Sequence, residues 1–222
     1  MTISRGSGDK THVWRESYSR VSKDLLRSSQ ATNRSRIKTL GLHSLRHDAR
    51  ILDVGAGDGN LFTTLRNAGF RQIWGLEYQA ELAALHPDRS RIVIASAADI
   101  PFASGSMEVV IVMDVLHHLP GAQLPRCISE MRRVLEPGGV LFVCEPAGTL
   151  FRKILTAMLM SPLSRISRFS RDKRAMVEAE RETLDPWLEA ERGIPAQIAA
   201  GGFSIDFFER CWLHHYGRFR AV

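Results

Sequence analysis

The sequence lacks any long apolar run and any cysteine motif, and both absences exclude classes of protein. No stretch approaches the roughly 20 consecutive apolar residues that a membrane-spanning helix needs. The first thirty residues are polar and charged, without the apolar core of a secretory signal, so we expect a cytoplasmic protein. The three cysteines, Cys127, Cys144 and Cys211, lie far apart and form no CxxC pair. Neither a disulfide framework nor a metal site is therefore expected.

Strong compositional bias is absent too. Apolar residues make up 44% and charged residues 24% of the 222 residues, which is ordinary globular usage and predicts one packed domain. Positive charge gathers outside the middle of the chain: residues 1–50 carry 11 basic and 4 acidic residues, and residues 151–174 carry 7 and 1. Such blocks suit contact with nucleic acid, anionic lipid or an acidic small molecule, and equally a solvated basic surface.

Short apolar runs alternate with helical periodicity through the middle of the chain. Runs that are apolar throughout and alternate with helices indicate a parallel sheet covered on both faces. Strands are predicted at 51–54, 73–77, 92–94, 109–113 and 140–144, with helices at 61–67, 81–85 and 124–135. Helices are also expected at 14–30 and about 33–45, before this core, and at 183–200 after it. Final strands at 205–212 and 213–219 would form an antiparallel pair.

A glycine-rich turn follows the first predicted strand. Gly55, Gly57 and Gly59 let the backbone approach a ligand closely, and the helix after them presents free N–H groups. Glu77 ends the next strand, 24 residues after Asp53, where a carboxylate can accept both hydroxyls of a ribose. The spacing is GxGxG and not the GxGxxG of dinucleotide sites, which disfavours a nicotinamide oxidoreductase.

Five segments, in order, resemble the motifs of class I S-adenosylmethionine-dependent methyltransferases. They are 51–61 (ILDVGAGDGNL), Glu77, 97–102 (AADIPF), 109–119 (VVIVMDVLHHL) and 135–142 (LEPGGVLF). The sequence is similar to the branch that includes the ubiquinone and menaquinone methyltransferases. The resemblance implies S-adenosylmethionine as cofactor and S-adenosylhomocysteine as product. It covers the core well, and covers the N-terminal helices and residues 147–183 poorly.

The predicted fold class is α/β: a Rossmann-like, doubly wound, mostly parallel seven-stranded sheet with N-terminal helices and a helical insertion after strand five. We expect a single methyltransferase domain, residues 1–222, with four parts. These are an N-terminal helical lid (1–48), a cofactor-binding core (49–146), a helical cap insertion (147–183), and the last helix with the final strand pair (184–222).

The resemblance also assigns roles to residues of the cofactor site. Asp53 and Gly55 would meet the methionine end of the cofactor, Gly57 would lie beneath it, and Asp114 would lie near its amino group. Glu77 would hold the ribose, with Tyr78 beside the adenine. Asp99 would bond the adenine amino group, and Ile100 would add a backbone contact. The other predicted cofactor-binding residues are Ala56, Gly59, Asn60 and Ala98.

Candidate acceptor-site residues lie after the fourth and fifth strands. His117 and His118 are each a candidate base, since a histidine titrates near neutral pH; a packing or capping role is the alternative. Glu145 is a second candidate. The resemblance also makes Trp14 and Tyr18 candidate residues of a lid over the cofactor, with packing in the core as the alternative. Residues 150–174 interleave apolar and basic side chains, which suits a cover over a hydrophobic or lipid-linked acceptor, a contact with an anionic membrane, or an ordinary cap helix.

The predicted function is methyl transfer to a small, hydrophobic or lipid-linked acceptor. A nucleic-acid methyltransferase is an alternative, favoured by the isoelectric point of about 9.6. Against it, residues 114–117 (DVLH) lack the Asn/Asp-Pro-Pro-aromatic motif of amino-group methylases, and no RNA-binding module is recognisable. A non-catalytic, cofactor-binding regulator on the same fold is a further alternative. No pattern in the sequence identifies the acceptor, the methylated atom or the oligomeric state.

Overall fold

A computed structural model describes residues 23–119, 121–161 and 168–222 of the chain. The predicted lid residues Trp14 and Tyr18, and the first predicted helix up to residue 22, lie outside the described residues. Their roles stay predictions. No helix in the described part of the chain is long and apolar enough to cross a membrane.

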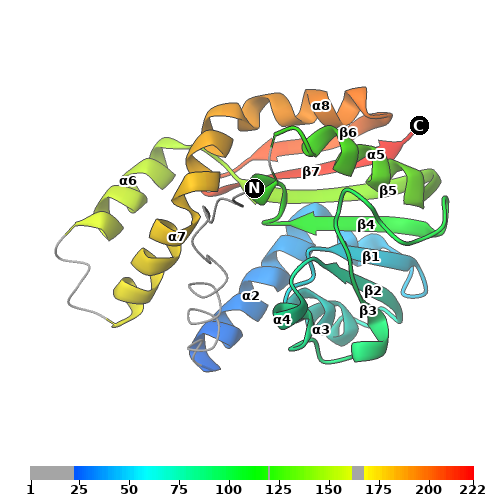
Figure 1. Ribbon diagram of the computed structural model, residues 1–222, viewed down its shortest axis with the longest axis horizontal. Coiled ribbons are helices and arrows are strands. Elements are labelled where there is room, and N and C mark those ends of the chain that lie inside the picture. Colours follow the sequence, from blue (N-terminus) through cyan, green and yellow to red (C-terminus); the bar gives the residue numbers. More distant parts are fainter. Residues whose placement is uncertain (1–22, 120, 162–167) are drawn as a thin grey trace, which may run out of the picture.

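The centre of the fold is a seven-stranded sheet in the order β3-β2-β1-β4-β5-β7-β6 (Figure 1). Neighbours among β1 to β5 pair in parallel, and β7 runs antiparallel to both β5 and β6. The predicted doubly wound, mostly parallel sheet and the final antiparallel pair are confirmed. The strands are β1 (Arg50–Val54), β2 (Gln72–Glu77), β3 (Ile92–Ile94), β4 (Met107–Met113), β5 (Leu135–Pro146), β6 (Phe203–Arg210) and β7 (His214–Ala221).

Helices pack on both faces of this sheet and enclose two apolar cores. Successive residues of β1 alternate between them: Ile51 packs with Leu40 and Leu65, and Leu52 with Ile128 and Trp187. The first core lies under α2 (Lys23–Leu40), η1 (Leu42–Ser44) and α3 (Asn60–Asn67), and the second under α5 (Leu124–Val134), α7 (Arg168–Ala190) and α8 (Ile194–Ala200). The remaining helical segments are α4 (Ala80–Ala83), η2 (Arg89–Arg91), η3 (Leu116–His118), α6 (Leu150–Met160) and η5 (Glu191–Gly193).

The N-terminal helices differ from the prediction. The chain does not break between residues 30 and 33, because α2 is one continuous helix from Lys23 to Leu40. It ends at Leu40, five residues before the predicted end of the second helix. The next residue, Gly41, has a φ of 78°, which favours glycine and ends the helix. Asn33, Ile37 and Leu40 are buried at spacings of four and three, so the polar residues around position 30 do not interrupt the helix.

The predicted helix at 183–200 is wrong in its bounds. α7 begins at Arg168 and ends at Ala190, η5 follows, and α8 begins at Ile194. Pro195 lies in the first turn of α8, where its missing N–H costs no hydrogen bond. The proline therefore marks the start of a new helix within the predicted one. Residues 184–190 therefore share a helix with the end of the predicted cap insertion.

We expect the core beneath α3 to be sensitive to truncation. Leu65 is fully buried, so Leu65→Ala should lower the free energy of unfolding by about 2–5 kcal/mol, since it removes packed methyl groups and leaves a cavity. Leu85→Ala is the matched control, because Leu85 is 60% exposed, and it should change stability by about 0.5 kcal/mol or less. Urea unfolding followed by circular dichroism measures both, and equal effects would contradict the packing described for α3.

Candidate active site

The loop between β1 and α3 needs glycine at two positions for different reasons. Gly55 has a φ of +76°, and a Cβ placed on it would lie 2.2 Å from the Val115 side chain. Gly57 has a φ of +55°, and a Cβ there would meet nothing within 4 Å among the described residues. The backbone at Gly55 is therefore pressed against the loop after β4, whereas Gly57 faces open space that a ligand can occupy.

That open space belongs to a cavity of about 690 Å³ at the carboxyl ends of the parallel strands. This is where ligands bind in doubly wound sheets. Six predicted site residues line the cavity: Gly55, Gly57, Glu77, Tyr78, Asp114 and His118. Its other lining residues are Leu76, Gln79, Leu82, Ala95, Ser96, Ala97, Val115, Leu119 and Gln123.

Glu77 holds the backbone on two sides of the cavity. One carboxylate oxygen accepts a hydrogen bond from the Gly57 N–H and the other from the Gln79 N–H, each at 2.8 Å. The side chain is largely buried, and each oxygen retains a second lone pair. Glu77 can therefore shape the glycine loop and still accept hydroxyl donors from a ligand.

Asp53 lies at the carboxyl end of β1 and is 3% exposed. Its Oδ2 atom has no hydrogen-bond partner among the described residues. Burial, and the nearby charge of Glu77, raise the pKa of Asp53 to about 7. A buried carboxylate without a partner is stabilised by a positively charged ligand group.

Asp114 directly follows β4 with a φ of +55°, the one positive φ at a non-glycine residue in the described part of the chain. Its Oδ2 pairs with Arg36 Nη1 at 2.5 Å, and its Oδ1 lies 3.5 Å from His214 Nε2. Arg36 Nη2 and His214 Nε2 are 2.8 Å apart, which closes the three-residue cluster. Burial alone would raise the pKa of Asp114, but Arg36 and His214 outweigh it and hold that pKa below its usual range.

The segment after β3 is placed differently from the prediction. Ser96 and Ala97 line the cavity, and Asp99 is exposed outside it. The backbone of Ile100 is already engaged, since its N–H donates to Glu130 at 2.8 Å and its carbonyl accepts from Arg133 at 2.7 Å. Ala95 to Ala97 come first after β3 and so reach the carboxyl edge of the sheet, whereas Asp99 lies further along the chain.

Four other predicted cofactor residues lie behind the wall of the cavity. Ala56 is buried, and its N–H donates to the carbonyl of Leu76. Gly59 caps α3 with a φ of 78°, and Asn60, the first residue of that helix, accepts a hydrogen bond from Asn33. Ala98 is buried in the apolar core. None of these four residues lines the cavity. Ala56, Gly59 and Asn60 shape the loop between β1 and α3, and Ala98 belongs to the segment after β3.

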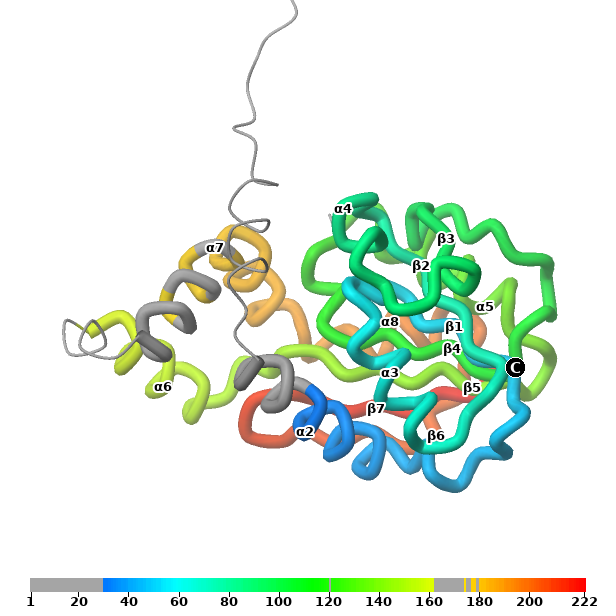
Figure 2. Tube along the Cα trace, turned by 90° about the horizontal axis from the view of Figure 1, so that it is seen from below, coloured from blue at the N-terminus to red at the C-terminus, as the bar shows by residue number. Residues whose placement is uncertain are grey.

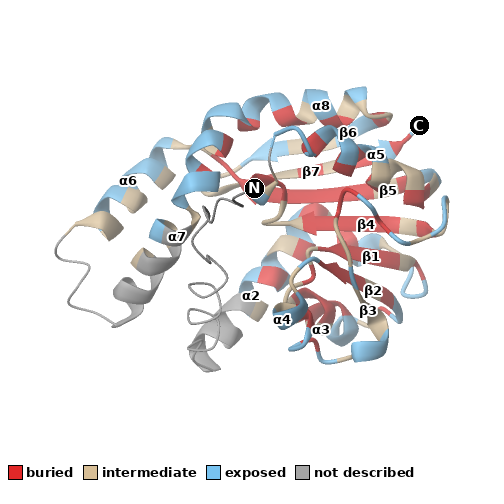
Figure 3. Ribbon diagram, viewed as in Figure 1, coloured by how far each residue is buried: buried red, intermediate tan, exposed pale blue. Residues whose placement is uncertain are grey.

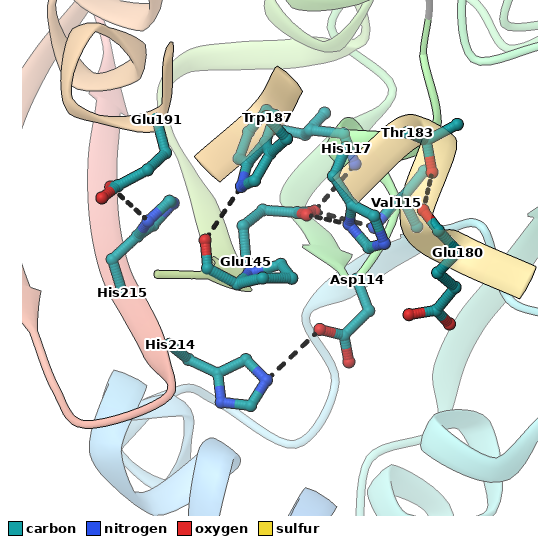
Figure 4. Close-up of polar contacts among 12 residues, drawn as sticks. Asp114, Val115, His117, Glu145, Glu180, Thr183, Trp187, Glu191, His214 and His215 are labelled. Carbon is teal, nitrogen blue, oxygen red and sulfur yellow. Dashed lines mark hydrogen bonds and ion pairs between the residues drawn. The ribbon is translucent and has the colours of Figure 1, made fainter. Parts of the chain in front are cut away.

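Glu145, at the end of β5, is fully buried and organises the η3 segment (Figure 4). Its Oε1 accepts from the Val115 and Leu116 N–H groups at 2.8 Å each, and its Oε2 lies 2.8 Å from His117 Nδ1. Burial alone would lower the pKa of His117, but its hydrogen bond to Glu145 and that carboxylate's charge raise it above the usual value. Both side chains lie away from the cavity, where they support its wall.

His118, by contrast, lines the cavity beside Asp114 and Leu119. Its ring centroid lies 4.0 Å from that of His117. Its side chain is partly exposed, and desolvation on its cavity side, followed by the charge of His117, lowers the pKa of His118 to about 4. The two adjacent histidines therefore have opposite properties: His117 favours its charged form beside Glu145, and His118 stays neutral near pH 7.

A second buried cluster joins the end of β6 and the start of β7 to α7 and η5. Glu191 accepts from Arg210 at 2.6 Å and lies 3.4 Å from His215, and Trp187 donates to the Pro146 carbonyl at 2.8 Å (Figure 4). Trp187 also contacts His117 at 6.3 Å and stacks on His215 at 6.0 Å between ring centroids. These contacts hold α7 against the segment that carries His117 and His118.

Sequence reasoning missed Arg36, His214 and Ser96. Arg36 lies on a helix far from every motif, and nothing in its local pattern indicates a partner 78 residues away. His214 stands in a His-His pair at the start of the last strand, a signal that could have been weighed. Ser96 could have been found by asking which residues come first after the third strand.

Known proteins with similar sequences are methyltransferases, which agrees with a cavity at the carboxyl ends of the parallel strands. Residues 52–143 match the profile of a methyltransferase domain family. The chain is 30% identical over 134 residues to the 27-O-demethylrifamycin SV methyltransferase of Amycolatopsis mediterranei, with 54% of this chain and 48% of that protein covered. It is 28% identical over 165 residues to a demethylmenaquinone methyltransferase of Mycobacterium sp., with 70% and 67% covered. The chain thus spans about half the length of the first relative.

Solved structures share the fold at low identity. A magnesium protoporphyrin IX methyltransferase from Synechocystis, solved with bound S-adenosylhomocysteine, superposes with a TM-score of 0.62 at 16% identity, over 97% of this chain and 95% of that one. A methyltransferase from Aquifex aeolicus gives 0.60 at 13% identity, over 97% and 100%. Residues 52–143, and the fold of the described chain, are thus similar to those of the S-adenosylmethionine-dependent methyltransferase family. The cofactor of that family is S-adenosylmethionine.

The residues present fit this cofactor on two independent observations. Gly57 leaves room on the cavity side, and Glu77 offers carboxylate oxygens to hydroxyl donors at the same place. Asp53 is a buried carboxylate without a partner in the described residues, and the cofactor carries a cationic amino group and a cationic sulfonium. Asp114 is already neutralised by Arg36, whereas no ion pair with a cationic side chain is found for Asp53 or Glu77 among the described residues.

The buried hydrogen bonds of Glu145 generate a stability prediction. Glu145→Ala leaves two backbone N–H groups and His117 without their acceptor, so we expect a loss of about 3–5 kcal/mol in the free energy of unfolding. Glu136→Ala is the control: this glutamate forms an ion pair with Arg50, its side chain is 39% exposed, and its loss should cost about 1 kcal/mol or less. Urea unfolding at pH 7 compares them, and a similar cost for both would contradict the Glu145 network.

Proposed function

We propose that the chain transfers a methyl group from S-adenosylmethionine to a small hydrophobic acceptor. The observation that supports this is one cavity with the Glu77 and Gly57 pair at one side and His118 and Leu119 at the other. Such a cavity can hold a cofactor against its acceptor. The names of the two relatives point the same way, because they denote methylation of a demethylrifamycin and of demethylmenaquinone.

When bound, S-adenosylmethionine supplies a methyl group activated on a sulfonium. The chain then has three tasks. Glu77 accepts hydroxyl donors of the cofactor, and Asp53 balances its positive charge. The apolar side chains of Leu76, Val115 and Leu119 exclude water from the transfer. The third task is to hold the nucleophile in line with the methyl group, which the walls of the cavity would do.

His118 is the candidate general base by its position, although its lowered pKa makes it a weaker base than an ordinary histidine. It lies in the wall of the cavity, and its lowered pKa keeps the ring neutral at pH 7. As the acceptor atom forms its bond to the methyl carbon and the bond from that carbon to sulfur breaks, His118 takes the acceptor's proton. His117 and Glu145 are positioning residues, since they hold the backbone before His118 and do not reach the cavity.

The cofactor assignment is tested by calorimetric titration with S-adenosylmethionine, with NADH as the negative control. We expect micromolar binding of the first ligand only, and binding about 10–100-fold weaker in Glu77→Ala, because charge-assisted hydrogen bonds are lost. Glu81→Ala removes an exposed carboxylate four residues further along and should leave the affinity unchanged. Absence of binding to the wild-type chain would overturn the proposal and favour a non-catalytic role.

The base is tested with a water-soluble, short-chain quinol as acceptor. His118→Gln should lower kcat by roughly 10²-fold or more with a smaller change in KM, while His43→Gln, an exposed histidine elsewhere, should lower neither. Because the pKa of His118 is lowered, the wild-type rate should persist as the pH falls below 6.5 and decline only towards about pH 4. A decline near pH 6.5 that survives in His118→Gln would exclude His118 as the base.

A further inference from the structure

The water-facing side of α6 is apolar, which is unusual for a helix at the surface of a protein. Leu150, Ile154 and Met158 repeat every four residues along one side, and they are 73%, 52% and 65% exposed. None of the eleven described residues of α6 is buried. The exposed side of a helix that packs only against its own protein normally carries polar residues. The outward face of α6 therefore lacks a partner within the described chain.

Two aromatic side chains extend this face. Phe151 is 42% and Trp212 is 72% exposed, and their ring centroids lie 5.1 Å apart in an edge-to-face contact. We call Leu150, Phe151, Ile154, Met158 and Trp212 together the α6 face. It holds five of the ten large apolar side chains that are exposed in the described residues. Contiguous exposed apolar side chains mark an interaction site more often than scattered ones do.

The position of α6 leaves this face accessible. α6 and α7 form a hairpin that extends sideways from the sheet, and α6 is its outer member (Figures 1 and 2). Coloured by burial, α6 carries exposed and intermediate residues along its length, whereas the strands are largely buried (Figure 3). A flat surface that approaches the molecule from this side meets α6 first.

The charge around the α6 face is positive. Lys153 is exposed on α6, and Arg152 bonds the carbonyls of Ala147 and Leu213 at the start of the helix. These two are the charged residues of α6, which carries no acidic side chain. Apolar residues flanked by lysine and arginine are typical of helices that lie on an anionic bilayer.

We propose that the α6 face docks on the surface of an anionic lipid bilayer. The apolar side chains would enter the boundary between headgroups and acyl chains, with Trp212 at the headgroup level, where tryptophan is preferred. With eleven residues, α6 is about 16 Å long and too short to cross the bilayer, so it would lie along the surface. A second copy of the chain is disfavoured as occupant, because a symmetric contact would place one basic segment against another.

This proposal goes beyond the proposed function and does not depend on it. A bilayer contact at α6 would stand whether or not the cavity accepts the cofactor, and the two are measured separately. Vesicle binding reports on the α6 face, and calorimetry with S-adenosylmethionine reports on the cavity.

The test is sedimentation of the full chain with vesicles of phosphatidylcholine alone, or of phosphatidylcholine with phosphatidylglycerol. We expect binding to the anionic vesicles, weaker binding to the neutral ones, and loss of binding as salt is raised. Ile154→Ser should weaken binding to anionic vesicles at least about fivefold, since an apolar side chain no longer enters the bilayer. Ile205→Ser is the matched control, because Ile205 is 48% exposed on β6, outside the α6 face, and it should bind as the wild type does.

Three results would overturn the proposal: no binding of the wild type to anionic vesicles, equal binding of Ile154→Ser and Ile205→Ser, or equal binding to both vesicle types. Sedimentation velocity without vesicles provides a further check. A concentration-dependent dimer that Ile154→Ser abolishes would assign the α6 face to a second copy of the chain. Circular dichroism and cofactor titration confirm that each variant is folded.

Discussion

The pairing of β1 between β2 and β4 is the constraint on which the candidate site depends. Val54, the last residue of β1, is in register with Leu76 on one side and Val112 on the other. Because all three strands run in parallel and end together, the loops that follow them converge on one edge of the sheet. Gly55, Glu77 and Asp114, far apart in the sequence, therefore line one cavity. The contact of Gly55 with Val115 then fixes how close two of these loops can lie.

Charge within this edge is unevenly compensated. Asp114 has Arg36 and His214 as partners, and the carboxylate of Glu77 is held by two backbone N–H groups, but Asp53 has no partner atom for Oδ2 in the described residues. Two neighbouring buried carboxylates with one uncompensated oxygen favour a cationic ligand over an anionic one. This preference suits S-adenosylmethionine, which carries a cationic amino group and a cationic sulfonium. The charge of these residues therefore supports S-adenosylmethionine as the ligand, a conclusion for which the GxGxG spacing alone was weak evidence.

The fold could be predicted from the sequence, because apolar runs and glycine turns are local signals. The site was predicted in part. Gly57 and Glu77 stand in motifs, whereas Arg36 reaches Asp114 only after α2 packs beside the sheet, and no local pattern encodes that distance. The resemblance singled out Asp99, but this residue comes five positions after the end of β3 and lies outside the cavity, whereas Ser96 lines it. Helix bounds failed at 183–200, where one helix was predicted but α7 ends at Ala190 and a new helix begins at Ile194, with Pro195 in its favourable first turn.

Basic residues gather in the segment that holds α6 and the start of α7, and acidic residues in the core that precedes it. Residues 51–150 carry 11 acidic and 7 basic residues, and residues 151–174 the opposite excess of 7 basic over 1 acidic. A hydrophobic acceptor that resides in a bilayer would reach this protein from the side that faces the lipid, and α7 is fastened to the histidine segment of the cavity through Trp187. A chain whose cap attracts an anionic surface, and whose core attracts a cationic cofactor, can bring the two substrates in from different directions.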